Sequence, residues 1–315
     1  MNYGVNVPTS GGASEYSSLP FCGEIDWIDQ RSYGVAVDEL GYDSVAVPDH
    51  LMTGSGATTE CLATITGLAG VTESVDLYPK TINNHLRPGP LLAKTVATVD
   101  AVSGGRVKLG MGAGWKRDEA VAYGYDWPDP PERLREMEET IELTKRLWTE
   151  DEVTYEGEFY DIQGATCRPH PVQDPHPPIM IGGGGEQFTL RIAAKHAATW
   201  NYYGSVDLMA RKLDVLREHC ERVDRPYDEI EKSWFARCVV RETDEEVEAL
   251  LEEVPRFKPE HVGDDEDHLV GTPAEVCEQL QPYVDLGFEE FVVEFVDFPE
   301  TTGLELFADE VVPNV

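Results

Sequence analysis

Short apolar runs alternate with longer amphipathic stretches along most of the chain. The apolar runs predict eight strands, at residues 2–7, 42–48, 75–82, 106–111, 178–181, 198–202, 230–240 and 288–294. Helical spacing follows in between, at residues 24–40, 58–68, 90–102, 131–148, 188–194, 208–223, 244–251, 272–283 and 304–312. Alternating strands and helices form parallel sheets, so eight such units predict an α/β fold, a (β/α)8 TIM barrel that spans residues 1–315. A doubly wound sheet is the weaker alternative because it needs fewer units.

One stretch, at about residues 152–178, interrupts this alternation after the fourth helix. Residues 153–160 have the pattern of a small hairpin with Glu156 and Gly157 at its turn. Five prolines follow and crowd the end of the stretch, at positions 169, 171, 175, 177 and 178. We therefore predict an insertion here, a hairpin or a lid, rather than a core element.

The charge of the chain limits its partners. The sequence has 60 acidic and 25 basic residues, a formal net charge of −35. Such an excess disfavours nucleic acid and anionic membranes as partners. Carboxylates cluster at residues 243–246 and 263–267, but others are spread through most of the predicted helices. We interpret them as a solvated surface suited to high salt, hence a halophilic source, rather than as an acidic docking tail.

Cysteine and histidine spacing predicts no metal site. The six cysteines are scattered without a Cys-x-x-Cys pair, and no two histidines have a convincing metal-ligand spacing. The N-terminal residues have no basic region and no long apolar run, and no stretch is long enough for a membrane span. We expect a cytoplasmic protein.

In a barrel of this kind the active site lies at the carboxyl ends of the strands. This rule selects Asn6, the pair Asp49 and His50, and residues 82–85, 112–115, 182–187, 200–203 and 294–297. Asp49 and His50 directly end a predicted buried strand. An imidazole there can hydrogen-bond a carbonyl or move a proton near neutral pH. The alternative is a structural pair in which Asp49 caps the next segment.

Two glycine-rich segments also follow strands. Gly182 to Gly185, followed by Glu186 and Gln187, lead from a strand into a helix, where backbone N–H groups can approach a phosphate. A flexible turn is the alternative, since neither a Walker loop nor a dinucleotide fingerprint is present. Gly112, Ala113 and Gly114 would let a planar ring approach the backbone, or would form a tight turn. Trp115, next to them, could line a pocket.

Several of these segments together resemble one family. Residues 41–51, with the sequence Gly-Tyr-Asp-Ser-Val-Ala-Val-Pro-Asp-His-Leu, resemble the second-strand motif of the bacterial-luciferase-like monooxygenase superfamily. Residues 91–95, 103–107, 109–115, 171–173, 177–185 and 270–273 are similar to its further motifs, in the same order over nearly the whole chain. The subclass most similar is the coenzyme F420-dependent oxidoreductases, and the acidic composition is typical of a haloarchaeal member.

The resemblance implies a cofactor at the carboxyl face of the barrel, either coenzyme F420 or, as the alternative, FMN. It implies a non-prolyl cis peptide within Lys80, Thr81 and Ile82, behind the cofactor ring. It places Gly112, Ala113 and Gly114 along the ring, and it places Gly182, Gly183, Gly184, Gly185, Glu186 and Gln187 at the phosphate. Members often form homodimers or larger homo-oligomers.

The reaction implied is hydride transfer between F420 and a small organic substrate. His50 would hydrogen-bond the reacting centre or shuttle a proton, and Asp49 would hold His50 or bond to the ring edge. Arg168, Lys116 and Arg117 could meet the anionic tail of F420, although surface ion pairs are the preferred interpretation. An FMN-dependent monooxygenase and a non-catalytic flavin-binding protein are the alternative functions.

The substrate cannot be assigned from the resemblance. Sugar-phosphate dehydrogenases of this superfamily carry a glutamate where this chain has Trp115. They also carry a tryptophan shortly after the Asp-His pair, where this chain has residues 51–54, Leu-Met-Thr-Gly. Both departures count against a sugar-phosphate substrate.

Overall fold

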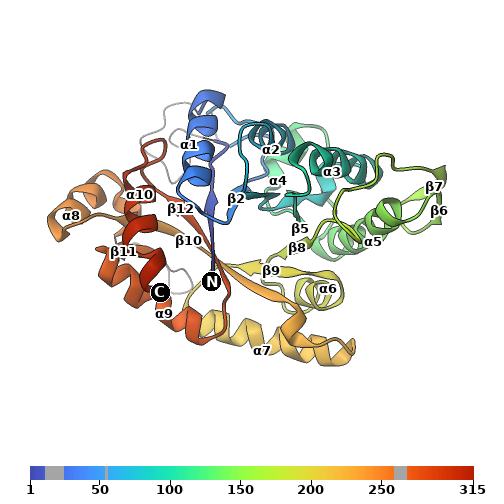
Figure 1. Ribbon diagram of the computed structural model, residues 1–315. Coiled ribbons are helices and arrows are strands. Elements are labelled where there is room, and N and C mark those ends of the chain that lie inside the picture. The colour runs from blue at the N-terminus through green and yellow to red at the C-terminus, as the bar shows by residue number, and fades with distance from the viewer. Residues whose placement is uncertain (11–24, 54–55, 259–267) are drawn as a thin grey trace.

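A parallel β-barrel surrounded by helices forms the molecule (Figure 1). The computed structural model describes residues 1–10, 25–53, 56–258 and 268–315. The barrel strands are β1 (Asn2–Asn6), β2 (Ser44–Val47), β3 (Asp76–Pro79), β4 (Ile82–Asn83), β5 (Leu109–Gly112), β8 (Ile179–Gly182), β9 (Thr199–Tyr202), β10 (Glu231–Val240) and β12 (Glu290–Phe295). Their order is β3-β2-β1-β12-β10-β9-β8-β5-β4, and a parallel bridge joins Leu77 of β3 to Val107, just before β5. The predicted TIM barrel is confirmed.

The strand predicted at residues 75–82 is present as two pieces, β3 and β4. Lys80 and Thr81 separate them, and a non-prolyl cis peptide bond joins these two residues. The cis peptide therefore lies where the family resemblance places it. With β3 and β4 counted as one strand, the barrel positions agree with all eight predicted strands.

Helices cover the outside of the barrel. They are α1 (Trp27–Glu39), α2 (Cys61–Ala69), α3 (Gly89–Ser103), α4 (Arg117–Ala122), α5 (Pro130–Thr149), α6 (Thr189–His196), α7 (Val206–Arg222), α8 (Asp244–Glu253), α9 (Pro273–Asp285) and α10 (Thr302–Glu310). Thr272 caps α9, and its hydroxyl and Glu275 form a capping box that satisfies N–H groups at the helix start. The pattern did not predict α4, which is short and polar. It also did not predict β11 (Leu269–Gly271), a three-residue strand beside the end of β10.

Side chains inside the barrel lie in layers, because alternate residues of each strand point inward. The middle layer is apolar: Ala46, Tyr78, Met180, Phe235 and Val292 pack together. Two residues earlier, toward the amino ends, Ser44, Ser233 and Glu290 form a buried polar layer. Burial raises the pKa of Glu290, while Lys108, whose Nζ lies 3.6 Å from its carboxylate, opposes the rise.

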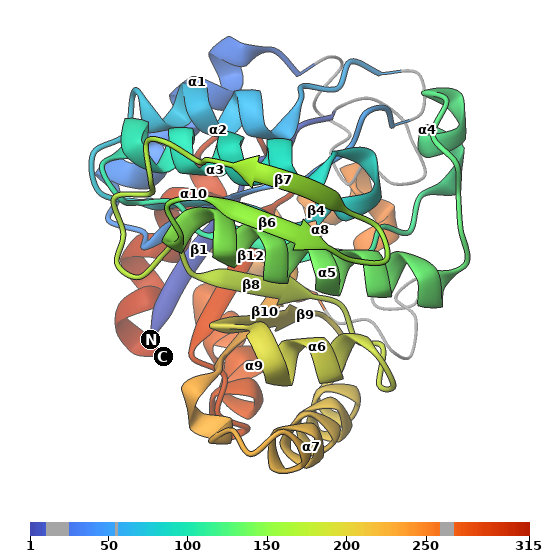
Figure 2. The same cartoon turned by 90° about the vertical axis from the view of Figure 1, so that its right-hand side faces the viewer.

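A hairpin is present in the predicted insertion, but the predicted turn at Glu156 and Gly157 is wrong, because Glu156 is still part of the first strand and the second strand begins only at Asp161. It consists of β6 (Val153–Glu156) and β7 (Asp161–Ala165), so residues 157–160 form the turn. The carboxylate of Glu139, in α5, accepts hydrogen bonds from the N–H groups of Glu158 and Tyr160, both at 2.9 Å. Figure 2 shows the hairpin lying across the outer side of α3 and α5.

The Pro-rich part of the insertion does not form the predicted lid. The N–H of Val172 donates to Asp100 of α3 at 2.6 Å, and Gln173 Nε2 donates to the carbonyl of Val107 at 2.7 Å. Val107 lies before β5, at the amino end of the barrel, opposite the catalytic face of such barrels. Arg168 belongs to this segment and pairs with Asp151. This ion pair agrees with the preferred interpretation of Arg168 as a residue in a surface ion pair.

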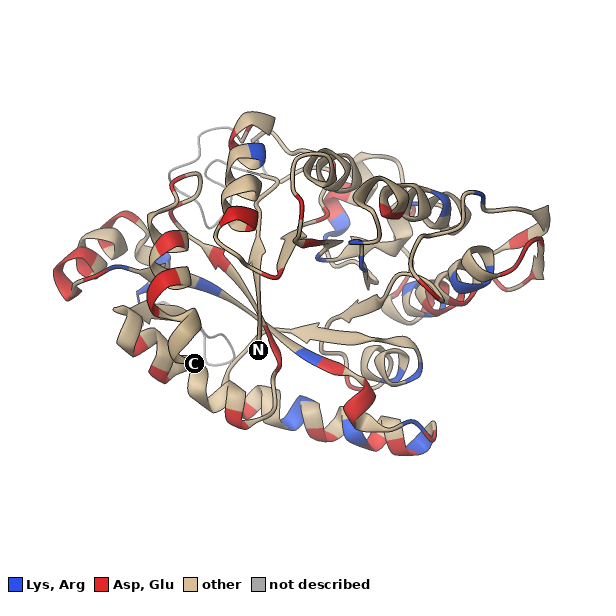
Figure 3. Ribbon diagram, viewed as in Figure 1, with Lys and Arg blue, Asp and Glu red and all other residues tan. Residues whose placement is uncertain are grey.

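Charge is distributed as the composition indicates. Figure 3 shows acidic residues spread along the outer helices, whereas few charged residues lie on the barrel strands. None of the helices in the described part of the chain is long and apolar enough to cross a membrane.

Candidate active site

His50 follows β2 at the mouth of the barrel, and a buried carboxylate holds its imidazole. Nδ1 lies 3.1 Å from Oε1 of Glu119, whose side chain is 1% exposed. The same carboxylate accepts a hydrogen bond of 2.9 Å from the N–H of Leu51. An ionised carboxylate only accepts, so Nδ1 carries the proton and Nε2 is left as an acceptor. The described residues provide no hydrogen-bond partner for Nε2, and 19% of the imidazole is exposed.

Two aromatic residues frame this pair. The Trp115 ring meets His50 edge to face, with centroids 5.7 Å apart, and its side chain is largely exposed. The Tyr123 hydroxyl donates to the carbonyl of Leu51 at 3.1 Å. Trp115 therefore stands beside the imidazole, and its role in lining a pocket stays a prediction.

Asp49 has a different partner from the one proposed. Arg87 binds its carboxylate with two nitrogens, at 2.6 and 2.7 Å, and the N–H of Asn83 donates to it at 2.8 Å. The carboxylate that contacts His50 is Glu119 rather than Asp49. Asp49 thus joins the end of β2 to β4 and to the loop that follows, which agrees with a structural role.

Thr81, on the far side of the cis peptide, packs between two glycines. A Cβ at Gly112 would lie 2.6 Å from Thr81 Oγ1, and a Cβ at Gly182 would lie 2.6 Å from Thr81 Cγ2. Both contacts are closer than carbon atoms tolerate. The close packing of Thr81 is therefore one reason for glycine at both positions, and their predicted cofactor contacts stay predictions. Ile82 is fully buried behind this segment.

Hydrogen bonds from an arginine side chain hold the loop after β5 in position. Arg133 of α5 donates to the carbonyls of Ala113 at 3.0 Å and Gly114 at 3.3 Å. Gly114 has a φ of +73°, which favours glycine, and a Cβ there would overlap the amide of Asn83. The segment is a tight turn whose position is set from outside the barrel.

The glycine run after β8 contains backbone N–H groups that have no hydrogen-bond acceptor among the described residues. Gly183 donates its N–H to Asn201 at 3.1 Å, and its φ is +121°. For the N–H groups of residues 184–187, the described part of the chain offers no hydrogen-bond acceptor. The Glu186 side chain instead pairs with Lys212 at 2.7 Å and Arg211 at 3.3 Å, which lowers its pKa. A run of N–H donors before a helix is the donor set that a phosphate requires.

Of the two remaining basic residues predicted near the mouth, Lys116 is buried and Arg117 is exposed. The Lys116 Nζ lies 2.9 Å from Asp118 and 5.8 Å from the centre of the Trp115 ring. The ion pair agrees with the preferred interpretation of Lys116 as a residue in a local salt bridge.

The family follows from comparison with known proteins. The family model described as luciferase-like monooxygenase matches residues 1–268. The chain belongs to this family. The predicted resemblance is thereby confirmed, as is the prediction of an enzyme.

Relatives of this luciferase-like protein use two kinds of cofactor. An F420-dependent glucose-6-phosphate dehydrogenase of Microbacterium testaceum is 28% identical and covers 90% of this chain and 92% of its own. An FMNH(2)-dependent dimethylsulfone monooxygenase of Pseudomonas putida is 28% identical, with 72% of each chain covered. The solved structure of an F420-dependent secondary alcohol dehydrogenase in complex with an F420-acetone adduct matches with a TM-score of 0.82 at 19% identity, covering 100% of this chain and 98% of its own. The last likeness shows the fold.

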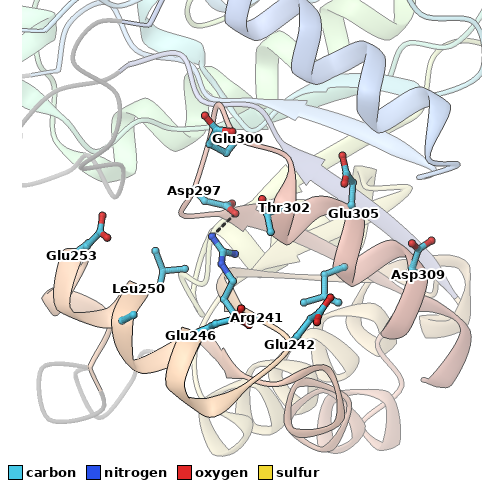
Figure 4. A pocket seen from close by; sticks show the side chains of 12 residues that line it. Arg241, Glu242, Glu246, Leu250, Glu253, Asp297, Glu300, Thr302, Glu305 and Asp309 are labelled. Atoms are coloured by element: carbon cyan, nitrogen blue, oxygen red, sulfur yellow. Dashed lines mark ion pairs between the residues drawn. The ribbon is translucent and has the colours of Figure 1, made fainter.

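A cavity of about 630 Å³ lies between α8 and α10 of this luciferase-like protein (Figure 4). Arg241, after β10, pairs there with Asp297, after β12, at 2.9 Å. Six more carboxylates line the cavity: Glu242, Glu246, Glu253, Glu300, Glu305 and Asp309. Barrel enzymes frequently bind phosphate after the seventh and eighth strands. Here that region is acidic and repels an anion.

Several residues of the site were not predicted. No sequence pattern marked Glu119 or Arg87 as a site residue, because each lies in a polar segment far along the chain from its partner, His50 or Asp49. Arg237 of β10, whose Nε donates to Glu294 of β12 at 3.0 Å, could have been found, because a charge within the apolar run 230–240 indicates a polar contact.

Proposed function

We propose that this luciferase-like protein is an oxidoreductase that transfers a hydride between coenzyme F420 and a small organic substrate. The observation that carries the proposal is the set of F420-dependent relatives that align over about nine-tenths of the chain, including one from Nakamurella multipartita at 29% identity. FMN is the alternative cofactor, supported by the dimethylsulfone monooxygenase.

The residues present fit such a cofactor at two points. Residues 184–187 supply N–H donors for its phosphate. The acidic cavity after β10 and β12 disfavours the other common phosphate position, which strengthens the case for the glycine run. Lys80 and Thr81, with the cis bond between them, would lie behind the ring, and the turn at residues 112–114 would lie beside it.

When bound, F420 would supply the hydride chemistry at C5. His50 would act through Nε2, accepting the proton of a substrate hydroxyl in one direction and returning it in the other. Glu119 would keep the imidazole oriented with its proton on Nδ1. Trp115 would cover the imidazole and limit water around the reacting proton.

The substrate would be a small molecule other than glucose 6-phosphate. Trp115 places an indole, rather than a carboxylate, next to His50. A hydroxyl-rich sugar ring needs hydrogen-bond partners at such a position, and an indole ring offers only its N–H. We also propose a homodimer, which size-exclusion chromatography with light scattering would test; a monomer at micromolar concentration would contradict it.

Titration of the apoprotein with F420 and with FMN tests the cofactor. We expect the fluorescence of F420 to change with saturation and that of FMN to change weakly. Tight FMN binding without an F420 response would replace the proposal by the FMN-dependent monooxygenase. Reduced F420 that binds but never transfers its hydride to any acceptor in a broad panel would favour a non-catalytic cofactor-binding protein.

His50→Ala then tests the residue assigned to proton transfer. We expect hydride transfer to slow by about 100-fold or more while F420 affinity changes little. An unchanged rate would show that His50 is not the proton-transfer group.

A further inference from the structure

Hydrogen bonds hold the backbone of the glycine run by its carbonyl groups. Trp200, a fully buried residue of the neighbouring strand β9, donates its Nε1–H to the carbonyl of Gly183 at 2.9 Å. The N–H of Leu190, in α6, donates to the carbonyl of Gly185 at 3.0 Å. Regular elements on both sides of the run thus fix two of its peptide planes.

Helix α7 holds the carbonyl of Glu186. His219 Nε2 lies 2.7 Å from this oxygen. A carbonyl only accepts, so Nε2 carries the proton and donates it. Lys212, about two turns earlier in α7, contacts the Glu186 carboxylate at 2.7 Å. His219 and Lys212 are both buried, so α7 contacts Glu186 at two points with side chains that water barely reaches.

The orientation of a carbonyl also determines the orientation of the next N–H group. In a trans peptide the C=O of one residue and the N–H of the next lie in one plane and point in opposite directions. The cis peptides of the described chain lie outside residues 183–187. The bond from Trp200 therefore turns the N–H of Gly184 to the opposite side. The bond from His219 does the same for the N–H of Gln187, and neither N–H has an acceptor among the described residues.

This orientation matters because glycine has more backbone freedom than any other residue. A run of four glycines rotates its peptide planes easily unless neighbouring groups hold them. A phosphate binds best where the N–H groups are already oriented, since less ordering then accompanies binding. Side chains behind the run can therefore set phosphate affinity without touching the phosphate.

We propose that His219 and Trp200 are positioning residues of the phosphate site, because each holds one peptide plane so that its N–H faces the phosphate of the cofactor. This inference rests on the proposed function, because it concerns the site at which that cofactor is bound. The ligand group is a phosphate ester, with F420 and FMN as its two sources. Each residue acts through one backbone carbonyl and does not contact the ligand.

The contribution of the phosphate to cofactor affinity tests this role. Fluorescence titration of the protein gives the dissociation constants of F420 and of the same deazaflavin without its phosphate and tail. FMN and riboflavin form a second pair, which differs by the phosphate alone. The constant of the phosphate-free compound divided by that of its partner isolates the phosphate contribution.

His219→Leu removes the hydrogen-bond donor. We expect the affinity ratio to fall about tenfold, because an N–H bond to a phosphate is charge-assisted. Binding of the phosphate-free compound should change little. His219→Gln should restore most of the ratio, since its amide can donate to the same carbonyl. Equal weakening of both members of a pair, or no change in either, would overturn the proposal.

His170→Leu is the matched control. His170 Nδ1 also contacts a backbone carbonyl, that of Trp148 at 2.6 Å, but this contact belongs to the Pro-rich segment. The control should leave the affinity ratio unchanged. A similar fall in both variants would reflect a general effect of losing a histidine–carbonyl bond and would count against a positioning role of His219.

Amide NMR tests the orientation of the donors without a cofactor. Inorganic phosphate is added to the nitrogen-15-labelled protein, with potassium chloride at equal ionic strength as the reference. We expect the amide signals of Gly184 and Gln187 to shift with phosphate only. Trp200→Phe should reduce the shift at Gly184 alone, and His219→Leu the shift at Gln187 alone. Signals that do not respond to phosphate in the wild-type protein would contradict the proposal.

These measurements separate the positioning role from the proposed function. If F420 does not bind but the FMN-to-riboflavin ratio depends on His219, the assignment of F420 fails and the positioning role stands. If F420 is reduced at the expected site but His219→Leu leaves the ratio unchanged, the positioning role fails and the proposed function stands.

Discussion

At the scale of single residues, the site depends on which carboxylate meets which base. Glu119 contacts His50, while Asp49, its neighbour in sequence, is paired with Arg87. Both pairs are partly shielded from water, so each oriented hydrogen bond has more effect than it would on the surface. The Glu119 contact fixes the His50 tautomer, and the Arg87 contact fixes the backbone beneath it.

Glu119→Gln tests the orientation of His50. The amide has one acceptor oxygen, which the N–H of Leu51 can take, so Nδ1 no longer has a carboxylate to hold its proton. We expect the fraction of His50 with its proton on Nδ1 to fall, as measured by nitrogen-15 NMR of the imidazole. Hydride transfer should slow by about tenfold, with cofactor affinity retained.

Glu136→Gln is the matched control for this substitution. Glu136 contacts Nδ1 of His85 at 2.8 Å, and the other ring nitrogen of His85 contacts the carbonyl of Asp126. Both ring nitrogens of His85 therefore have partners, and neither partner contacts His50. A similar loss of rate in both variants would mean that the effect of Glu119 is not specific to His50.

At the scale of elements, helices α5 and α6 are joined by one carboxylate. Glu138 of α5 accepts from Lys195 at 2.5 Å and Arg191 at 2.8 Å, both in α6. His196 Nε2 lies 3.8 Å from the same carboxylate oxygen that Lys195 contacts. His196, Lys195 and Arg191 together lower the pKa of Glu138 to about 2.

Glu138→Gln should therefore reduce stability in a pH-dependent way. The folded-state pKa lies below the usual value of 4.5, so the contribution is complete above about pH 5 and is lost as the pH falls toward 2. We expect the variant to lose about 1–2 kcal/mol of unfolding free energy at pH 7, since solvent contact weakens the pairs. Denaturant unfolding across pH 3 to 7 measures the difference.

The control is Glu142→Gln, one turn along α5. Glu142 is half exposed and its carboxylate lies 3.9 Å from His196. Its replacement should change the unfolding free energy by less than about 0.5 kcal/mol. If both variants behave alike, the charge of the helix surface matters and the specific contacts between α5 and α6 do not.

At the scale of the whole molecule, the net charge of −35 is the feature that most affects how stability depends on salt. Acidic residues are spread along the outer helices (Figure 3). Like charges on such a surface repel one another, and salt screens this repulsion. The Debye length falls from about 10 Å at 0.1 M salt to about 3 Å at 1 M. Stability should therefore depend strongly on ionic strength.

Thermal unfolding in potassium chloride from 0.1 to 3 M tests this dependence. We expect the unfolding temperature to rise by at least about 10 °C over this range, most steeply below 1 M, where screening changes most. A protein that is fully folded and equally stable at low salt would contradict the halophilic interpretation. Potassium sulfate at equal ionic strength separates screening from the general stabilising effect of the salt.

The sequence by itself determined the barrel and the face that carries the site. Period-two apolar runs, helical spacing and the glycines and prolines between them are local signals, so they located all eight barrel strands. They also located His50 and the glycine run at strand ends. Family motifs added the position of the cis peptide between Lys80 and Thr81.

Only the tertiary structure decided which side chains meet. Glu119 lies 69 positions from His50, and Glu294 lies 288 positions from Asn6. Local periodicity tells which face of a strand is buried, but it does not tell which residues of other strands share that interior. The Pro-rich segment shows the same limit: its composition indicated an insertion, and hydrogen bonds to Asp100 and Val107 decided that it packs at the amino end of the barrel.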